Sequence, residues 1–146
     1  MPNLRIICDS AGFSDSKIKD LSSLEYIGGE ASFPFTSIEE LPKLKRIGKW
    51  ANFACCEIRN LNSLEYVGWA ADFRKSNLTS LPSLRRIKGT ADFSKTQIEE
   101  LPNLEEFCDF KKIVLNKRKQ ELFLNGVIKA TPTPSNKLFI IYIRFQ

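Results

Sequence analysis

The sequence contains no histidine, and this absence excludes several kinds of chemistry. Without histidine the chain has no Ser–His or Cys–His nucleophile pair and no His-ligated metal site. It also lacks the G-x-x-x-x-G-K-[ST] phosphate loop and the G-x-G-x-x-G dinucleotide fingerprint. We therefore expect a protein that is not an enzyme and that carries no cofactor and no metal.

Long hydrophobic runs are absent as well. The longest, "LFIIYI" at Leu138–Ile143, is far too short to span a bilayer as a helix. The N-terminus, "MPNLRIICDS", has no charged segment followed by a long apolar one, as a signal peptide would. We expect a soluble cytoplasmic protein without a membrane partner. Its 146 residues suffice for one domain that buries a core without disulfides or metals.

Acidic residues are scarce only at the C-terminal end. Residues 109–146 hold eight Lys or Arg against two acids, whereas the first 108 residues hold 14 basic and 15 acidic side chains. The net charge of +5 therefore belongs to the C-terminal segment and not to the body of the chain.

A 20-residue repeat dominates the sequence. Four segments, from "LSSLEYIGGEASFPFTSIEE" to "LPSLRRIKGTADFSKTQIEE", follow one another without insertion or deletion. Apolar residues recur in six columns, of which the clearest are Leu21, Leu41, Leu61, Leu81 and Leu101; Ala11, Ala31, Ala51, Ala71 and Ala91; and Phe13, Phe33, Phe53, Phe73 and Phe93. One repeat cannot bury six apolar positions alone, but stacked repeats can.

This pattern predicts a mostly β solenoid. The Ala-x-Phe alternation predicts one short parallel strand per coil, with Ala and Phe inward. The Leu-x-x-Leu-x-x-Ile spacing fits a tight helical or extended return on the opposite side. Pro42, Pro82 and Pro102 follow a column leucine and favour an irregular return over an α-helix.

The columns resemble the leucine-rich repeat family over about residues 3–108. Its core, L-x-x-L-x-L-x-x-N/C-x-L, lies over each unit, with Ala31 and Phe33 as the last two strand positions, Thr36 at the Asn/Cys position and Ile38 as the closing residue. The 20-residue unit rich in "LP" is most similar to the short bacterial-type class. Gly28 and its equivalents depart from the family, because they stand where its first leucine would be.

The resemblance bears on the adjacent Cys55 and Cys56. Cys56 shares a column with Ser16, Thr36, Ser76 and Thr96. In the family this side chain points into the turn and bonds backbone groups of neighbouring coils, which implies a structural role for Cys56. Cys8 and Cys108 lie five coils, roughly 24 Å, apart at ~4.8 Å per coil, too far for a disulfide. No structural disulfide is expected, as is usual in a reducing compartment.

We assign residues 1–108 to a five-unit array and residues 109–146 to a basic C-terminal cap of the same domain. Continued counting puts Ile113 in the Phe column and Asn116 in the Ser/Thr/Cys column, as in a degenerate sixth repeat. A competing interpretation is a hairpin that turns at Asn125-Gly126. Lys137–Phe145 is expected to form a final strand over the open edge.

Function is expected at outward positions that depart from the repeat, on what the family would make a concave face. Trp50 and Trp69 stand on adjacent coils where other coils carry Gly, Ser, Glu or Thr, and Phe35 and Cys55 share another outward column. These four residues predict a compact apolar patch, flanked by Arg74, Lys75 and Lys95, that binds a protein partner. A monomer or weak dimer is expected. Alternatively, the tryptophans cover core at the glycine corners, or Cys55 is a reactive thiol.

The basic cap provides the alternative function. Five of its residues are candidates for phosphate contacts to nucleic acid or for contacts to an acidic partner: Lys111, Lys112, Lys117, Arg118 and Lys119. The aromatic residues of a nucleic-acid platform are not interleaved with them. A third and weaker possibility is an enzyme that uses Asp72 and Asp92, which are paired on adjacent coils.

Overall fold

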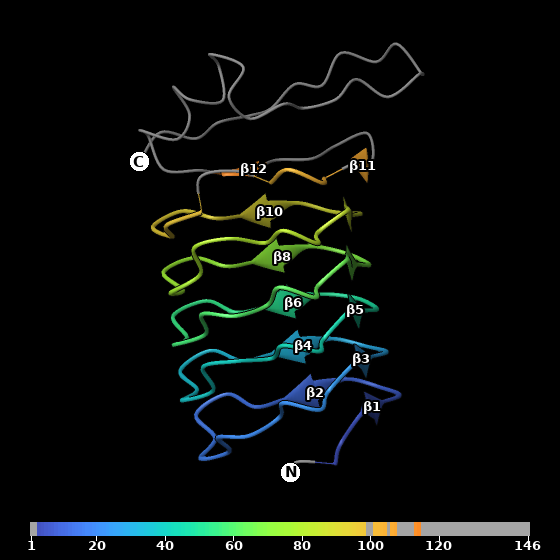
Figure 1. Ribbon diagram of the computed structural model, residues 1–146, viewed down its shortest axis with the longest axis vertical. Helices are drawn as coiled ribbons and strands as arrows, with labels where there is room; N and C mark the ends of the chain where they lie inside the picture. The colour runs from blue at the N-terminus through green and yellow to red at the C-terminus, as the bar shows by residue number, and fades with distance from the viewer. Residues whose placement is uncertain (1–2, 99–100, 105, 108–112, 115–146) are drawn as a thin grey trace.

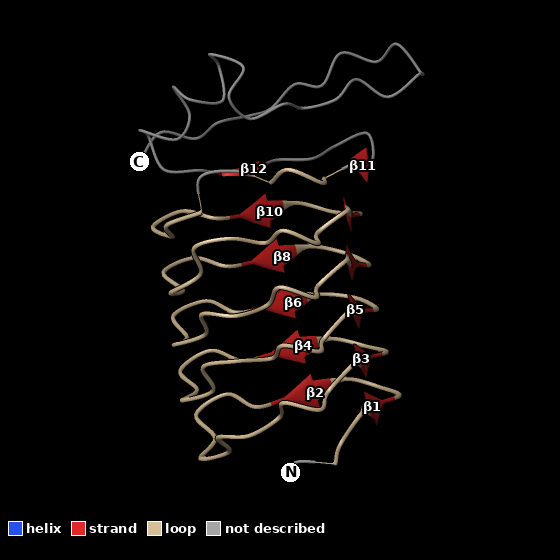
Figure 2. Cartoon of the chain, viewed as in Figure 1, coloured by secondary structure: helices blue, strands red, loops and turns tan. Residues whose placement is uncertain are grey.

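Each 20-residue period forms one coil of a β-solenoid in the computed structural model, which describes residues 3–98, 101–104, 106–107 and 113–114. Every strand is two residues long and runs parallel to its neighbours, and the described residues contain no helix (Figures 1 and 2). Sheet A has the order β1-β3-β5-β7-β9-β11, and sheet B has the order β12-β10-β8-β6-β4-β2. The predicted mostly β solenoid is therefore confirmed.

The strands recur at equivalent positions of successive coils. Sheet A contains β1 (Ile6–Ile7), β3 (Tyr26–Ile27), β5 (Arg46–Ile47), β7 (Tyr66–Val67), β9 (Arg86–Ile87) and β11 (Glu106–Phe107). Sheet B contains β2 (Ala11–Gly12), β4 (Ala31–Ser32), β6 (Ala51–Asn52), β8 (Ala71–Asp72), β10 (Ala91–Asp92) and β12 (Ile113–Val114).

Sheet A is an addition to the prediction of one strand per coil. Sheet B is the strand expected at Ala-x-Phe, whereas sheet A lies at the end of the segment that we expected to return irregularly. Tyr26 points outward and Ile27 is fully buried, so a single inward–outward alternation forms the strand. The sequence did not predict this strand because the Leu-x-x-Leu-x-x-Ile spacing before it does not alternate, whereas the Ala-x-Phe columns of sheet B do.

The core lies inside the coils and consists of the predicted columns, including Leu21, Leu24 and Ile38, which belong to neither sheet. The phenylalanines of the Phe column stack with ring centroids 4.9 to 5.6 Å apart, and Phe33, Phe53, Phe73 and Phe93 are fully buried. Equivalent residues of neighbouring coils therefore bury each other, which is why one coil alone has no stable core.

Glycines at one corner permit this close stacking. A Cβ at Gly28 would overlap the carbonyl oxygen of Cys8, and a Cβ at Gly48 would overlap that of Gly28 in the coil before it. Gly68 meets the carbonyl oxygen of Gly48 in the same way. These positions are glycine because two backbones approach each other directly.

A tight turn follows the Phe column in every complete coil. Its third residue has a positive φ, between 53° and 59°, although none of the five is glycine: Asp15, Phe35, Cys55, Lys75 and Lys95. Turns of this kind favour Gly or Asn at that position. We call these five residues the left-handed column.

Side chains close the same turn from within. The hydroxyls of Thr36, Ser76 and Thr96 donate to the carbonyl of the column phenylalanine three residues earlier, at 3.0, 2.8 and 2.7 Å. The Cys56 thiol donates to the Phe53 carbonyl at 2.9 Å. The structural role expected of this column is thus observed, but the bonds lie within one coil and do not join neighbouring coils.

The sixth coil departs from the expected register. Sheet A continues at a spacing of 20, because Phe107 pairs with Ile87, whereas in sheet B Ile113 pairs with Ala91. Two residues have been inserted, and the prediction that Ile113 continues the Phe column is wrong. The predicted turn at Asn125-Gly126, the strand at Lys137–Phe145 and the position of Asn116 lie outside the described residues.

Candidate functional site

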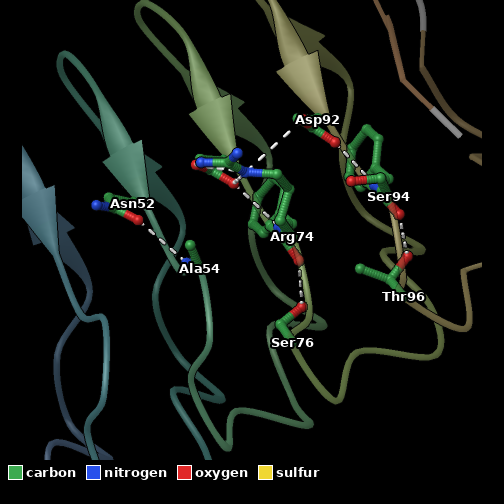
Figure 3. Close-up of polar contacts among 10 residues, drawn as sticks. Asn52, Ala54, Arg74, Ser76, Asp92, Ser94 and Thr96 are labelled. Atoms are coloured by element: carbon green, nitrogen blue, oxygen red, sulfur yellow. Dashed lines mark hydrogen bonds and ion pairs between the residues drawn. The ribbon is translucent and has the colours of Figure 1, made fainter. Parts of the chain in front are cut away.

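The outward surface of sheet B carries a row of polar side chains that are committed to the backbone. The side-chain oxygens of Asn52, Asp72 and Asp92 each accept the backbone N–H two residues later, at 3.1, 3.0 and 2.9 Å (Figure 3). This is the local bond by which Asn and Asp favour turns. The row leads each strand of sheet B into its left-handed turn.

Arg74 is held by the same row. Its guanidinium donates to the Asp72 carboxylate at 2.7 and 3.0 Å and lies 3.7 Å from the Asp92 carboxylate (Figure 3). The hydrogen bonds to Asp72 raise the pKa of the Arg74 guanidinium above its usual value. Asp72 and Asp92, the carboxylates considered for catalysis, therefore have structural partners, and these bonds use Nε and Nη2 of Arg74, whose side chain is 51% exposed.

The two tryptophans differ in exposure. Trp69 is 62% exposed, whereas Trp50 is half-buried. Trp69 directly follows Gly68, where the chain passes close to the carbonyl of Gly48 in the preceding coil. Because it is mostly exposed, Trp69 does not cover the core. The alternative that the tryptophans cover core at the corners therefore does not apply to Trp69.

Phe35 and Cys55 lie on neighbouring coils of the left-handed column. Phe35 is 65% exposed and has a φ of 57°, and Cys55 is half-buried with a φ of 53°. Lys75 and Lys95, also predicted site residues, continue this column on the next two coils and are exposed. The backbone pairing that stacks the coils includes Phe35 N–H donating to the Cys55 carbonyl at 3.3 Å.

The predicted patch is divided into two clusters. Trp50 lies at the start of the strand segment that contains β6, and the extended chain from Trp50 to Ala54 covers about 13 Å before Cys55 is reached. We call Trp50 and Trp69 the corner cluster and Phe35 with Cys55 the turn cluster. The polar row lies between them, so the four residues do not form one continuous apolar patch.

The cysteines have distinct environments. Cys56 is 4% exposed, and burial raises the pKa of its thiol to about 11, so this thiol stays protonated at neutral pH. That environment fits a structural residue and is unlike that of a reactive cysteine. Cys8, Cys55 and Cys56 are free thiols, and Cys108 lies outside the described residues.

Two features of the surface were not anticipated from the sequence. One is the left-handed backbone of the column that contains Phe35, for which the usual signal, a glycine or asparagine, is absent. The other is the outward side of sheet A, where Tyr26 and Tyr66 alternate with Arg46 and Arg86 at the 20-residue spacing. The candidate phosphate-binding residues Lys111, Lys112, Lys117, Arg118 and Lys119 lie outside the described residues.

No family model matches the chain, and no curated protein or solved structure shows significant similarity to it. Within the part of the chain that the structure describes, no group of three or more Cys, Asp or Glu residues is placed to hold a metal ion. The same residues include no helix with the length and hydrophobicity needed to cross a membrane.

Proposed function

We propose that the protein is a non-catalytic binding module that holds a protein partner on the outward side of sheet B. The observation that carries the proposal is Phe35, which is 65% exposed and has a φ of 57°. A bulky residue is disfavoured in left-handed backbone, and Gly or Asn would satisfy this turn better. Neither core packing nor backbone geometry accounts for phenylalanine at this position, whereas contact with a partner does.

Trp69 supports the same proposal from the other end of the surface. It is 62% exposed at a corner position that is glycine in two other coils, Gly29 and Gly89, so the fold does not require a large side chain there. Tryptophan is among the residues most enriched at binding hot spots. Trp50, half-buried beside it, adds rigid apolar surface to the corner cluster.

One partner can cover both clusters. Phe35 and Trp69 are two coils apart, roughly 10 Å along the solenoid at ~4.8 Å per coil, and about 13 Å or more apart across the strand. A standard interface buries about 800 Å² on each partner, a patch of about 30 Å across. The polar row and Arg74 would then lie at the centre of the interface, where they offer directional hydrogen bonds.

We further propose that the coils are a divergent form of the leucine-rich repeat. The six apolar columns and the buried Ser/Thr/Cys column that closes the turn support this assignment. The glycine corner and the hydrogen bonds within single coils are the points at which the chain differs from the family pattern. A cytoplasmic location, a monomeric or weakly dimeric state and the concave shape of the binding face stay predictions.

The test is a capture experiment followed by a titration. The full-length protein is used as bait in lysate of the organism that encodes it, at low and high salt, beside the Trp50→Ala/Trp69→Ala double variant. A captured protein is identified, purified and titrated calorimetrically against wild type and against Trp69→Ala and Phe35→Asn. Truncating a hot-spot residue costs about 2 kcal/mol or more, so each single variant is expected to weaken binding about 30-fold.

Ile6→Ala is the matched control, because Ile6 is 58% exposed but lies on sheet A. It removes a similarly exposed apolar side chain from the other sheet and should leave the affinity unchanged. Unchanged affinity in the Trp69 and Phe35 variants, or an equal loss in Ile6→Ala, would remove the proposed interface. Loss of affinity in only one of Trp69→Ala and Phe35→Asn would confine the interface to the cluster that contains that residue.

A further inference from the structure

Sheet A gathers basic side chains that the sequence scatters along the chain. Six Lys or Arg and two Glu occupy the outward strand positions and their immediate flanks in the five described coils: Arg5, Lys45, Arg46, Arg85, Arg86, Lys88, Glu25 and Glu65. We call this surface the sheet A face. Over residues 3–98 it carries a net charge of +4, whereas the remaining residues of that range hold eight basic and nine acidic side chains. In the sixth coil Glu106 of β11 pairs with Arg86, which lowers the net charge of the strand positions to +3.

One of the two acids on this face is already neutralised. The Arg5 guanidinium donates to both Glu25 carboxylate oxygens, at 3.0 and 3.2 Å. These hydrogen bonds hold the pKa of Glu25 below its usual range, so the carboxylate stays ionised and paired. The repulsion that Glu25 would exert on an anionic ligand is correspondingly reduced.

Aromatic rings alternate with the cations in one column. Parallel pairing places Tyr26 beside Arg46, Arg46 beside Tyr66 and Tyr66 beside Arg86. The Arg46 guanidinium lies 4.7 Å from the Tyr66 ring centroid, and Lys88 Nζ lies 5.9 Å from it. Tyr26 is 37% exposed. Rings and flat guanidinium groups therefore follow one another at the inter-coil spacing of about 4.8 Å.

A strip without side chains runs beside this column. Gly28, Gly48 and Gly68 stand two residues after Tyr26, Arg46 and Tyr66 and are only partly covered. Glycine is required at these three positions because carbonyl oxygens of the preceding coil approach closely, as described above. A consequence is that no side chain projects from these three positions themselves, whereas Lys88 continues the same column beside the Tyr66 ring and Trp69 follows Gly68.

We propose that the sheet A face binds single-stranded nucleic acid. Arg46, Arg86 and Lys88 would contact phosphates, and Tyr26 would stack on a base. Binding of single strands without sequence preference combines a basic track with aromatic platforms, and this face supplies both. An acidic peptide would satisfy the charge but would have no use for the rings. Because the rings need unstacked bases, a duplex should bind more weakly.

The site is centred on a different sheet from the proposed protein interface, and the two surfaces meet at the corner where Trp69 follows Gly68. Figure 1 shows β1, β3 and β5 on one side of the column of coils and β2, β4 and β6 on another. From Tyr26 to Arg86 the ring–cation column spans three inter-coil steps, roughly 14 Å at ~4.8 Å each. At about 3.4 Å per stacked nucleotide, this length holds about four nucleotides.

The experiment measures anisotropy of a fluorescein-labelled single-stranded DNA of mixed sequence, about 20 nucleotides long, with the full-length protein at about 50 to 200 mM salt. For wild type, the logarithm of the binding constant is expected to fall linearly with the logarithm of the salt concentration. Arg46→Gln/Arg86→Gln is expected to reduce the magnitude of the slope by about 1.4, the value for two lost phosphate contacts to a single strand. Tyr26→Ala is expected to weaken binding about tenfold at fixed salt.

Two charge-matched controls locate the binding. Lys17→Gln/Lys19→Gln removes two exposed cations outside this face and should leave the slope unchanged. Lys117→Gln/Arg118→Gln/Lys119→Gln tests the basic C-terminal segment. Thermal unfolding of every variant checks the fold, and if the double arginine variant does not fold, Tyr26→Ala decides the question alone.

Four results would overturn the proposal. The first is no binding by wild type at low salt, and the second is an equal loss in the Lys17/Lys19 control. The third is loss only in the Lys117–Lys119 variant, which would transfer the binding to the C-terminal segment. The fourth is competition by polyglutamate as effective as that by unlabelled DNA, which would make the ligand an acidic protein. Normal binding by Trp50→Ala/Trp69→Ala separates this test from that of the protein interface.

Discussion

Phe33 and Phe35 are two residues apart, and the structure predicts opposite consequences for replacing them. Phe33 is fully buried, and its ring centroid lies 5.0 Å from that of Phe13 and 4.9 Å from that of Phe53. Phe35 is 65% exposed in left-handed backbone. We predict that Phe33→Ala strongly destabilises the protein, whereas Phe35→Asn leaves its stability nearly unchanged.

The magnitudes follow from burial and backbone conformation. Replacing a buried phenylalanine by alanine costs about 3–5 kcal/mol, a large fraction of the ~5–15 kcal/mol by which domains are stable. At Phe35 about a third of the side chain is covered, roughly 70 Å², which is worth at most about 1.7 kcal/mol at ~25 cal/mol per Å². Relief of the left-handed conformation returns about 1 kcal/mol. The net change for Phe35→Asn is therefore within about 1 kcal/mol.

Urea unfolding followed by circular dichroism measures both effects as shifts of the midpoint at constant m-value. Phe35→Val serves as the backbone control, because a β-branched side chain tolerates positive φ poorly and should be less stable than Phe35→Asn. The reasoning is refuted if Phe35→Asn costs as much as Phe33→Ala. Phe35 would then be a packing residue, and its role in the proposed interface would lose its main support.

Two further predictions concern the column that closes the turn. Ser76→Ala removes a buried hydroxyl that donates to the Phe73 carbonyl, and it should lower the free energy of unfolding in urea by about 1 kcal/mol. Ser16→Ala removes a buried hydroxyl oxygen without a hydrogen-bond partner, and it should leave stability unchanged or raise it. Equal losses of stability in the two variants would contradict the assigned bonds. Burial raises the Cys56 pKa from 9.0 to about 11, so between these values the native state keeps a proton that the unfolded chain has lost, and stability should fall by about 2–3 kcal/mol as pH rises from about 9 to about 11. Cys56→Ser should abolish this component in urea midpoints measured across that range, and parallel curves for the two proteins would be evidence against it.

The interior of the fold was accessible from the sequence because the repeat is nearly perfect. Columns such as Leu44, Ala51 and Phe53 had to face inward, since apolar residues that recur every 20 positions are buried only by stacking. The second sheet was missed because the Leu-x-x-Leu-x-x-Ile spacing that leads into its strands does not alternate, whereas the Ala-x-Phe columns of sheet B do. The register of Ile113 was mispredicted because an insertion is invisible where the column residues have degenerated.

The candidate site was predictable only in part. The sequence identified Trp50, Trp69 and Phe35 as residues that the repeat does not require, and the structure exposes Trp69 and Phe35. The prediction of one patch was wrong, although the four residues between Trp50 and Cys55 already imply about 13 Å of extended chain. Nor did the sequence foresee that Arg74 would be held by Asp72 and Asp92.

The sequence by itself determined the coil to which each residue of the repeat belongs and whether it faces the core. Both follow from the 20-residue period together with the burial of apolar columns. Only the tertiary structure decided which outward residues share a surface, because the corners set the direction in which each segment runs around the coil. Residues 3–98 contain 14 basic and 11 acidic side chains, so their net charge is only +3. Folding gathers six of those cations on the sheet A face, and that segregation is a property of the solenoid's corners.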